Sequence, residues 1–116
     1  MVISTSIWHN PRCSKSRQAL TYLNQKNIRP VIRLYLEEPP TTSELENILL
    51  LLNLRAIELT RTKEIEFKTF PSYVINNESL LIKALVKHPK LIERPIIIKG
   101  DRAVVGRTIS KIDELL

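Results

Sequence analysis

The residue with the clearest chemical potential is Cys13, the single cysteine of a 116-residue chain. Arg12, Lys15 and Arg17 stand close to it, and His9 would add a fourth positive charge if it were protonated. Positive charge beside a thiol stabilises the thiolate, which is the nucleophilic form of cysteine. The pattern therefore predicts a reactive cysteine whose thiol pKa lies well below the free value of about 8.5.

The element expected to hold Cys13 is a helix that begins directly after it. Residues 14–26 carry an i, i+3, i+4, i+7 stripe made of Ser16, Ala19, Leu20 and Leu23. The first N–H groups of such a helix have no partner inside it, and its dipole favours a thiolate or a bound oxyanion at this end. Asn27 is expected to end the helix, with Ile28 as the apolar contact after it.

A lone cysteine is more often a small core residue than a nucleophile. Here the residue follows an Asn10-Pro11 turn in a basic loop, where apolar packing is not expected, so the pattern favours the reactive interpretation. His9 and Asn10 could simply hold the turn through hydrogen bonds to the backbone.

Ser16 completes a Cys-x-x-Ser pattern where dithiol redox proteins have Cys-x-x-Cys. A serine hydroxyl can donate to a thiolate but cannot resolve a mixed disulfide, so an outside thiol must complete any catalytic cycle. The alternative is that Ser16 only occupies the core face of the helix.

The surrounding elements form a recognisable order. Strands are expected over residues 2–8 and 31–36, which with the helix between them make a parallel β-α-β unit. A helix capped by Thr42 or Ser43 follows, then one or two short helices within 56–69 and a helix over 77–88 that Pro89 ends. Strands at 95–98 and 103–105 flank a Gly100-Asp101 turn, and Ser110 opens a last helix.

This order, β-α-β, helical segment, β-β-α, predicts an α/β fold with a parallel and an antiparallel half. The length indicates a single domain spanning residues 1–116. The longest apolar run, residues 48–52, is too short for a membrane span, and no signal peptide is visible, so a cytoplasmic location is expected. The net charge is +6, but the basic residues are scattered and only 5% of residues are aromatic, which favours small anions over nucleic acid as partners.

Residues 9–17, His-Asn-Pro-Arg-Cys-Ser-Lys-Ser-Arg, resemble the His-Asn-Pro-x-Cys-x-x-Ser-Arg signature of the glutaredoxin-coupled arsenate reductase family, ArsC. Blocks at 35–41, 59–61, 88–96 and 106–107 extend the resemblance along nearly the whole chain. Ser14-Lys15, where well-studied members often have Gly-Thr, resembles a short-form subgroup. The resemblance implies a thioredoxin/glutaredoxin-like fold with a helical insert at about 42–88, and a cis peptide before Pro95.

The resemblance also implies roles for individual residues. Cys13 would attack arsenate, and Arg61, Arg94 and Arg107 would bind the oxyanion through guanidinium N–H groups. The residues expected to keep the sulfur ionised are His9, Ser16 and Arg17. Glutathione would be the co-substrate and glutaredoxin the recycling partner of a monomer that binds no metal and no resident cofactor.

Two other functions fit parts of the pattern. Spx-type regulators share this fold and bind RNA polymerase, but they typically use a Cys-x-x-Cys switch, whose second cysteine is Ser16 here. A glutathione-dependent thiol transferase needs only Cys-x-x-Ser, but that function leaves the three arginines unexplained.

Overall fold

The computed structural model describes residues 3–116, which form two compact units. The first, called here the sheet unit, comprises residues up to Glu38 together with Arg94–Leu116. The second, the helical unit, is Pro39–Glu93, and it contains the whole of the predicted insert at about 42–88.

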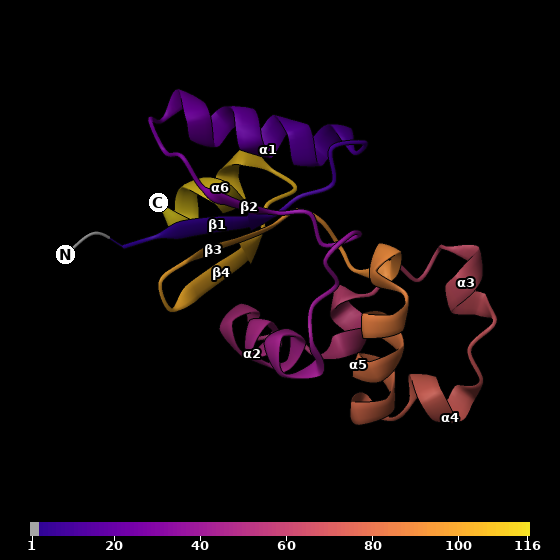
Figure 1. Cartoon of the computed structure of the whole chain (residues 1–116). Helices are drawn as coiled ribbons and strands as arrows, with labels where there is room; N and C mark the ends of the chain where they lie inside the picture. The colour runs from indigo at the N-terminus through magenta and orange to yellow at the C-terminus, as the bar shows by residue number, and fades with distance from the viewer. Residues whose placement is uncertain (1–2) are drawn as a thin grey trace. The chain divides into compact units, whose positions relative to one another are not determined.

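The sheet unit contains four strands and two helices (Figure 1). In chain order they are β1 (Thr5–Trp8), α1 (Ser14–Gln25), β2 (Val31–Arg33), β3 (Ile96–Lys99), β4 (Arg102–Val105) and α6 (Ile109–Leu115). The strand order is β2-β1-β3-β4, with β1 parallel to β2 and antiparallel to β3, and β3 antiparallel to β4. The predicted mixed α/β sheet, with its parallel and antiparallel halves, is confirmed.

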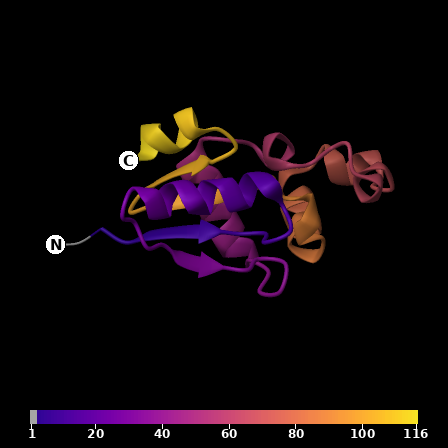
Figure 2. The ribbon, with the colours of Figure 1, turned by 90° about the horizontal axis from the view of Figure 1, so that it is seen from above.

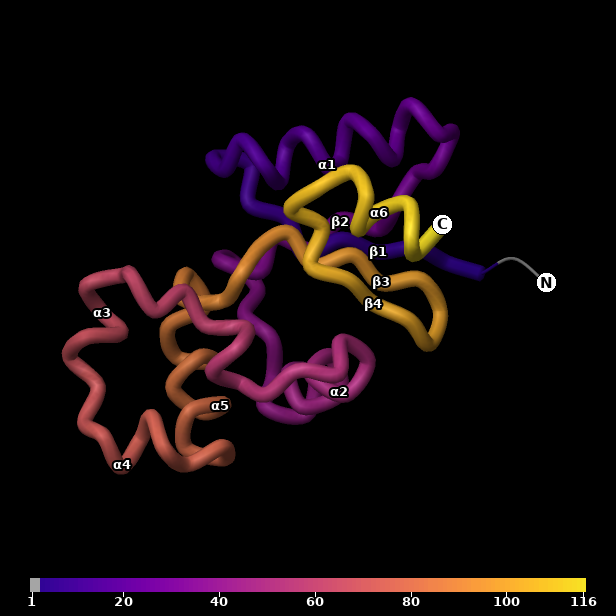
Figure 3. The backbone as a smooth tube through the Cα atoms, turned by 180° about the vertical axis from the view of Figure 1, so that it is seen from behind, coloured from indigo at the N-terminus to yellow at the C-terminus, as the bar shows by residue number. Residues whose placement is uncertain are grey.

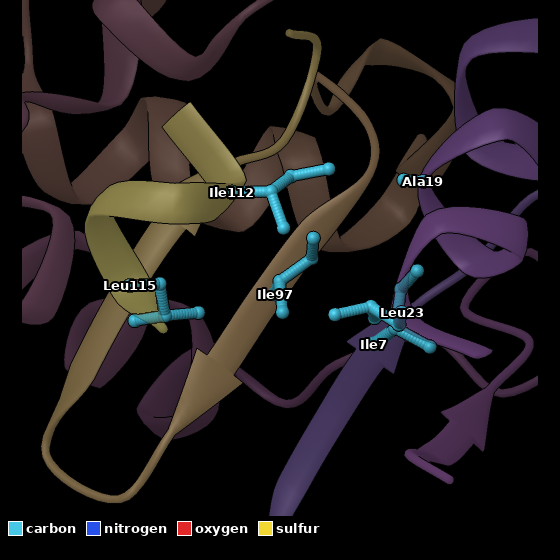
Figure 4. Packing of buried hydrophobic residues seen from close by; sticks show 6 residues of the cluster. All are labelled: Ile7, Ala19, Leu23, Ile97, Ile112 and Leu115. Carbon is cyan, nitrogen blue, oxygen red and sulfur yellow. The ribbon is translucent and has the colours of Figure 1, made fainter. Parts of the chain in front are cut away.

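Helices α1 and α6 cover one face of this sheet, which Figure 2 views from the helix side. Buried side chains of both helices meet those of the two central strands in one cluster, made of Ile7, Ala19, Leu23, Ile97, Ile112 and Leu115 (Figure 4). Gly106 follows β4 beneath α6, where a Cβ would lie 2.6 Å from Ile97 Cδ1. The cluster fixes α1, and with it Cys13, relative to the central strands.

The boundaries of α1 follow from local sequence. Cys13 is its N-cap, with extended backbone and no side-chain cap. The helix ends as predicted, because Asn27 adopts a left-handed φ of 63° and the Ile28 N–H donates to the Leu23 carbonyl at 2.9 Å.

Several sequence-based boundaries in this unit differ from the structure. The two strands expected at 95–98 and 103–105 are Ile96–Lys99 and Arg102–Val105. Strand β2 ends at Arg33 rather than at residue 36, because the N–H groups of Glu37 and Glu38 both donate to the Leu34 carbonyl and form a turn. The first strand begins at Thr5, and Val2 lies outside the described residues. Helix α6 begins one residue before Ser110, since Thr108 is its N-cap and accepts from the Lys111 N–H.

The helical unit is a series of short helices (Figure 3). They are α2 (Thr42–Leu52), η1 (Ala56–Leu59), α3 (Ile65–Lys68), α4 (Ser72–Ile75), α5 (Glu78–Lys87) and η2 (Pro89–Leu91). The cap of α2 is Thr41, not Thr42 or Ser43, because Thr41 and Glu44 form a reciprocal capping box. The sequence did not predict α4 or η2.

The two ends of the helical unit run side by side. Thr60 and Ile92 form an isolated antiparallel bridge. On either side of it, the Arg61 N–H donates to the Leu91 carbonyl at 2.7 Å and the Glu93 N–H donates to the Leu59 carbonyl at 2.8 Å. These bonds hold the backbone of residue 61 in a fixed position within the helical unit.

No helix among residues 3–116 is long and apolar enough to span a membrane.

Candidate active site

The loop between β1 and α1 is organised by Asn10. Its side-chain oxygen accepts from the Arg12 N–H at 3.0 Å, and its carbonyl accepts from the Cys13 N–H at 3.0 Å. The Arg17 guanidinium closes the loop from the helix side by donating to the Pro11 carbonyl at 2.9 Å. Asn10 and Arg17 therefore set the backbone path that brings Cys13 to the start of α1.

The Cys13 side chain is half-buried at the N-terminus of α1. Partial burial by itself raises the pKa of the thiol, but the backbone N–H groups of Ser16 and Lys15 and the charged guanidinium of Arg94 all donate to the sulfur. These contacts stabilise the thiolate and together hold the pKa of Cys13 below its ordinary value. The predicted direction of the shift is confirmed.

Arg94 comes to Cys13 through the pairing of β1 with β3. Trp8 pairs with Ile96 in antiparallel register, so the residues that follow β1 run beside those that precede β3. The peptide between Arg94 and Pro95 is cis, as the resemblance implied. The Nε and Nη1 atoms of Arg94 are buried and have no hydrogen-bond partner within the described part of the chain. A buried guanidinium with open donors next to a thiolate is suited to bind an oxyanion there.

Arg107 lies beside Arg94 in the same unit. Its Nη1 donates to the Arg94 carbonyl at 3.0 Å, and the N–H of the preceding Gly106 donates to the Pro95 carbonyl at 2.8 Å. Within the sheet unit, the Arg94 guanidinium thus contacts Cys13, and the Arg107 guanidinium contacts the backbone of Arg94. The Arg107 residue as a whole is exposed to solvent.

Arg61 belongs to the helical unit, where its guanidinium faces a carboxylate. Nη2 lies 2.9 Å from Glu64 Oε1, and Nη1 donates to the Lys90 carbonyl at 3.4 Å. The role of Arg61 toward an oxyanion stays a prediction.

His9 and Ser16 form a buried pair behind the loop. Ser16 Oγ lies 2.7 Å from His9 Nδ1 and also accepts from the Asn10 N–H at 3.0 Å. Burial lowers the pKa of His9, and the nearby charge of Arg17 lowers it further. His9 is therefore neutral at pH 7 and does not supply the fourth positive charge that protonation would have given. Its contact with the site is through Ser16.

Residues 8–115 match the family described as the ArsC family. The chain belongs to the ArsC family. An arsenate reductase of Haemophilus influenzae is 39% identical over 116 residues, which cover 98% of this chain and 100% of that protein. An arsenate reductase of Neisseria meningitidis serogroup A is 39% identical over 113 residues, covering 95% of this chain and 96% of that one.

Solved structures agree with this assignment. The arsenate reductase from Vibrio cholerae superposes with a TM-score of 0.93 at 36% identity and covers 100% of both chains. The thioredoxin-like fold predicted for an ArsC chain is thereby confirmed.

One feature of this ArsC chain's site was missed from sequence. Thiolate stabilisation was expected from Arg12, Lys15 and Arg17, which are neighbours of the cysteine in the chain, whereas the guanidinium that donates to the sulfur is that of Arg94. The block at 88–96 marked Arg94 for the oxyanion, but only the pairing of β1 with β3 shows its contact with the thiol.

Among residues 3–116, His, Cys, Asp and Glu side chains form no group of three that could hold a metal ion.

Proposed function

We propose that this ArsC chain reduces arsenate to arsenite, with Cys13 as the nucleophile. The observation that carries the proposal is the Arg94 guanidinium, which donates to the Cys13 sulfur and keeps two further buried donor atoms open. A tetrahedral oxyanion bound by those donors would lie next to the thiolate that attacks it. The names of the relatives, arsenate reductases of similar length, support the same substrate.

The proposed reaction begins with arsenate bound by Arg94 and Arg107, with Arg61 as a third ligand on the strength of the family resemblance. The Cys13 thiolate forms a bond to arsenic, and one arsenate oxygen leaves as water after taking up protons. Guanidinium groups and helix N–H groups stabilise the negative charge during this step. Ser16 and the neutral His9 hold the loop in place, and Arg17 fixes it through the Pro11 carbonyl.

Glutathione is proposed as the reductant. Its sulfur bonds to the Cys13 sulfur, the electron pair of the sulfur–arsenic bond stays on arsenic, and arsenic(V) becomes arsenic(III). A thiolate of glutaredoxin then attacks the glutathione sulfur of the mixed disulfide and releases Cys13. The absence of a second cysteine in the sequence supports an external thiol for this step. We further propose that the chain works as a monomer in the cytoplasm, where glutathione keeps thiols reduced.

A coupled assay tests the proposal. Purified protein is incubated with arsenate, glutathione, glutaredoxin, glutathione reductase and NADPH, beside the Cys13→Ser variant. We expect NADPH consumption that requires both arsenate and Cys13. Consumption that does not depend on arsenate, with Cys13 still glutathionylated, would contradict the proposal and favour a thiol transferase.

A further inference from the structure

Two of the arginines assigned to the oxyanion, Arg94 and Arg61, differ in what already contacts them. Arg94 keeps two buried donor atoms without a partner in the described residues. Arg61, by contrast, places Nη2 2.9 Å from the carboxylate of Glu64. That carboxylate is the same kind of acceptor as the oxyanion that Arg61 is proposed to bind.

The backbone holds this ion pair together. The Arg61 N–H donates to the Leu91 carbonyl, and the Glu64 N–H donates back to the Arg61 carbonyl at 3.1 Å, which closes a turn. Glu64 is also the N-cap residue that precedes α3, and it stands at i+3 from Arg61. The turn therefore holds the two side chains next to each other. Their contact does not depend on two flexible surface groups approaching at random.

The pair is also partly shielded from water. The side chains of Arg61 and Glu64 are 26% and 28% exposed, whereas those of the nearby Lys90–Glu66 pair are 52% and 38% exposed. Ion pairs that lose part of their solvation are screened less than surface pairs. Glu64 should therefore compete measurably with any anion that approaches Arg61.

We propose that Glu64 is a positioning residue that competes with the oxyanion for Arg61 and so weakens oxyanion binding. This inference rests on the proposed function, in which Arg61 is an oxyanion ligand. An oxyanion that engages Arg61 must replace a carboxylate that the fold holds 2.9 Å away. Removal of the charge on Glu64 leaves Arg61 in place but frees its guanidinium for the oxyanion.

The test compares three variants with the wild type. Glu64→Gln removes the charge and keeps the shape of the side chain, while Glu64→Asp keeps the net charge but shortens the reach by one methylene. Glu66→Gln is the matched control, because Glu66 lies in the same segment and loses the same charge but pairs with Lys90 at 2.7 Å. The readouts are KM and kcat for arsenate, and the phosphate concentration that halves the rate of Cys13 alkylation by iodoacetamide.

We expect Glu64→Gln to lower KM for arsenate and the half-protective phosphate concentration about two- to five-fold, in line with a partly exposed ion pair. Glu64→Asp should change both in the same direction by less, and kcat and the Cys13 thiol pKa should stay unchanged. Unchanged or weaker binding in Glu64→Gln would overturn the inference, as would an equal gain in Glu66→Gln. If neither anion protects Cys13 in any variant and arsenate is not reduced, the proposed function itself has failed.

Discussion

The two units of the molecule differ in how their charge is used. The sheet unit has 11 Lys and Arg against 5 Asp and Glu, whereas the helical unit has 7 of each, so the whole net charge of +6 lies in the sheet unit. The helical unit pairs much of its charge internally, as in Arg61 with Glu64 and Lys90 with Glu66. Excess positive charge attracts anions, and it resides in the unit that also contains Cys13.

The units also differ in what holds them together. The sheet unit depends on strand pairing between distant segments, and this pairing brings Arg94 to Cys13. The helical unit is built from short helices around buried leucines of α2 and α5. Thiol activation is therefore a property of the sheet unit, whereas the helical unit contributes local structure and one candidate anion ligand, Arg61.

The largest expected effect is a loss of stability in the helical unit that leaves the thiol chemistry of Cys13 unchanged. Leu85 is fully buried in α5, and Leu85→Ala should lower the free energy of unfolding by about 2–5 kcal/mol through lost packing and a cavity. The Cys13 thiol pKa of the folded variant should not change, because every group that shifts it belongs to the sheet unit. Urea denaturation measures the first quantity and the pH profile of alkylation the second. A rise in the thiol pKa of this variant would show that thiol activation also depends on the helical unit.

Arg94→Ala should change the chemistry of the Cys13 thiol and leave the packing of the helical unit intact. Loss of the guanidinium raises the thiol pKa of Cys13 and should lower kcat/KM for arsenate about 10²-fold, the usual cost of a missing anion-stabilising donor. Arg102→Ala is the matched control, since it removes the same charge from β4 of the same unit. If both variants lowered activity equally, overall charge and not the Arg94 contact would be responsible.

Ser16→Ala tests the hydrogen bonds that the Ser16 hydroxyl makes to His9 and Asn10. The change leaves the Asn10 N–H and His9 without their shared hydroxyl partner in a buried position, which should cost about 1–3 kcal/mol of stability. Thermal and urea denaturation check this value. A loss below about 0.5 kcal/mol would show that water replaces the hydroxyl and that the pair is not structural.

The smallest expected effect is a pH dependence. Burial lowers the pKa of His9 below its ordinary value of 6.5, so the unfolded chain binds this proton more readily than the folded one. The stabilisation is fully present above pH 6.5 and is lost as the pH falls through the lower pKa of the folded state. His9→Gln should flatten the stability curve between about pH 5 and 6.5, above the range where carboxylates titrate.

Features of the fold that depend on residues close together in the chain could be predicted from the sequence, and features that depend on other contacts could not. Helix α1, its end at Asn27 and the turn at Gly100 depend on neighbouring residues and were predicted. The end of β2 was not, because it depends on two N–H groups that converge on the Leu34 carbonyl. The cap of α2 was misplaced by one residue because consecutive hydroxyl residues offer equivalent candidates, and only the bond to Glu44 decides among them.

The same distinction between local and distant contacts applies to the features of the candidate site. Cys13 at a helix start could be located from the chain alone, since its basic neighbours and the apolar stripe are local features. The neutral state of His9 could not, because it depends on burial behind the loop. The contact of Arg94 with the sulfur could not either, since it requires the register of β1 against β3.

The pH dependence of Cys13 alkylation in the wild-type protein tests most directly whether Cys13 is an activated thiolate at an oxyanion site. The rate constant for iodoacetamide is measured from pH 4 to 10, with intact mass confirming a single modification. We expect a midpoint below the free-cysteine value of about 8.5, and slower alkylation when arsenate is present. A midpoint at or above 8.5, with no effect of arsenate, would contradict an activated thiolate at an oxyanion site.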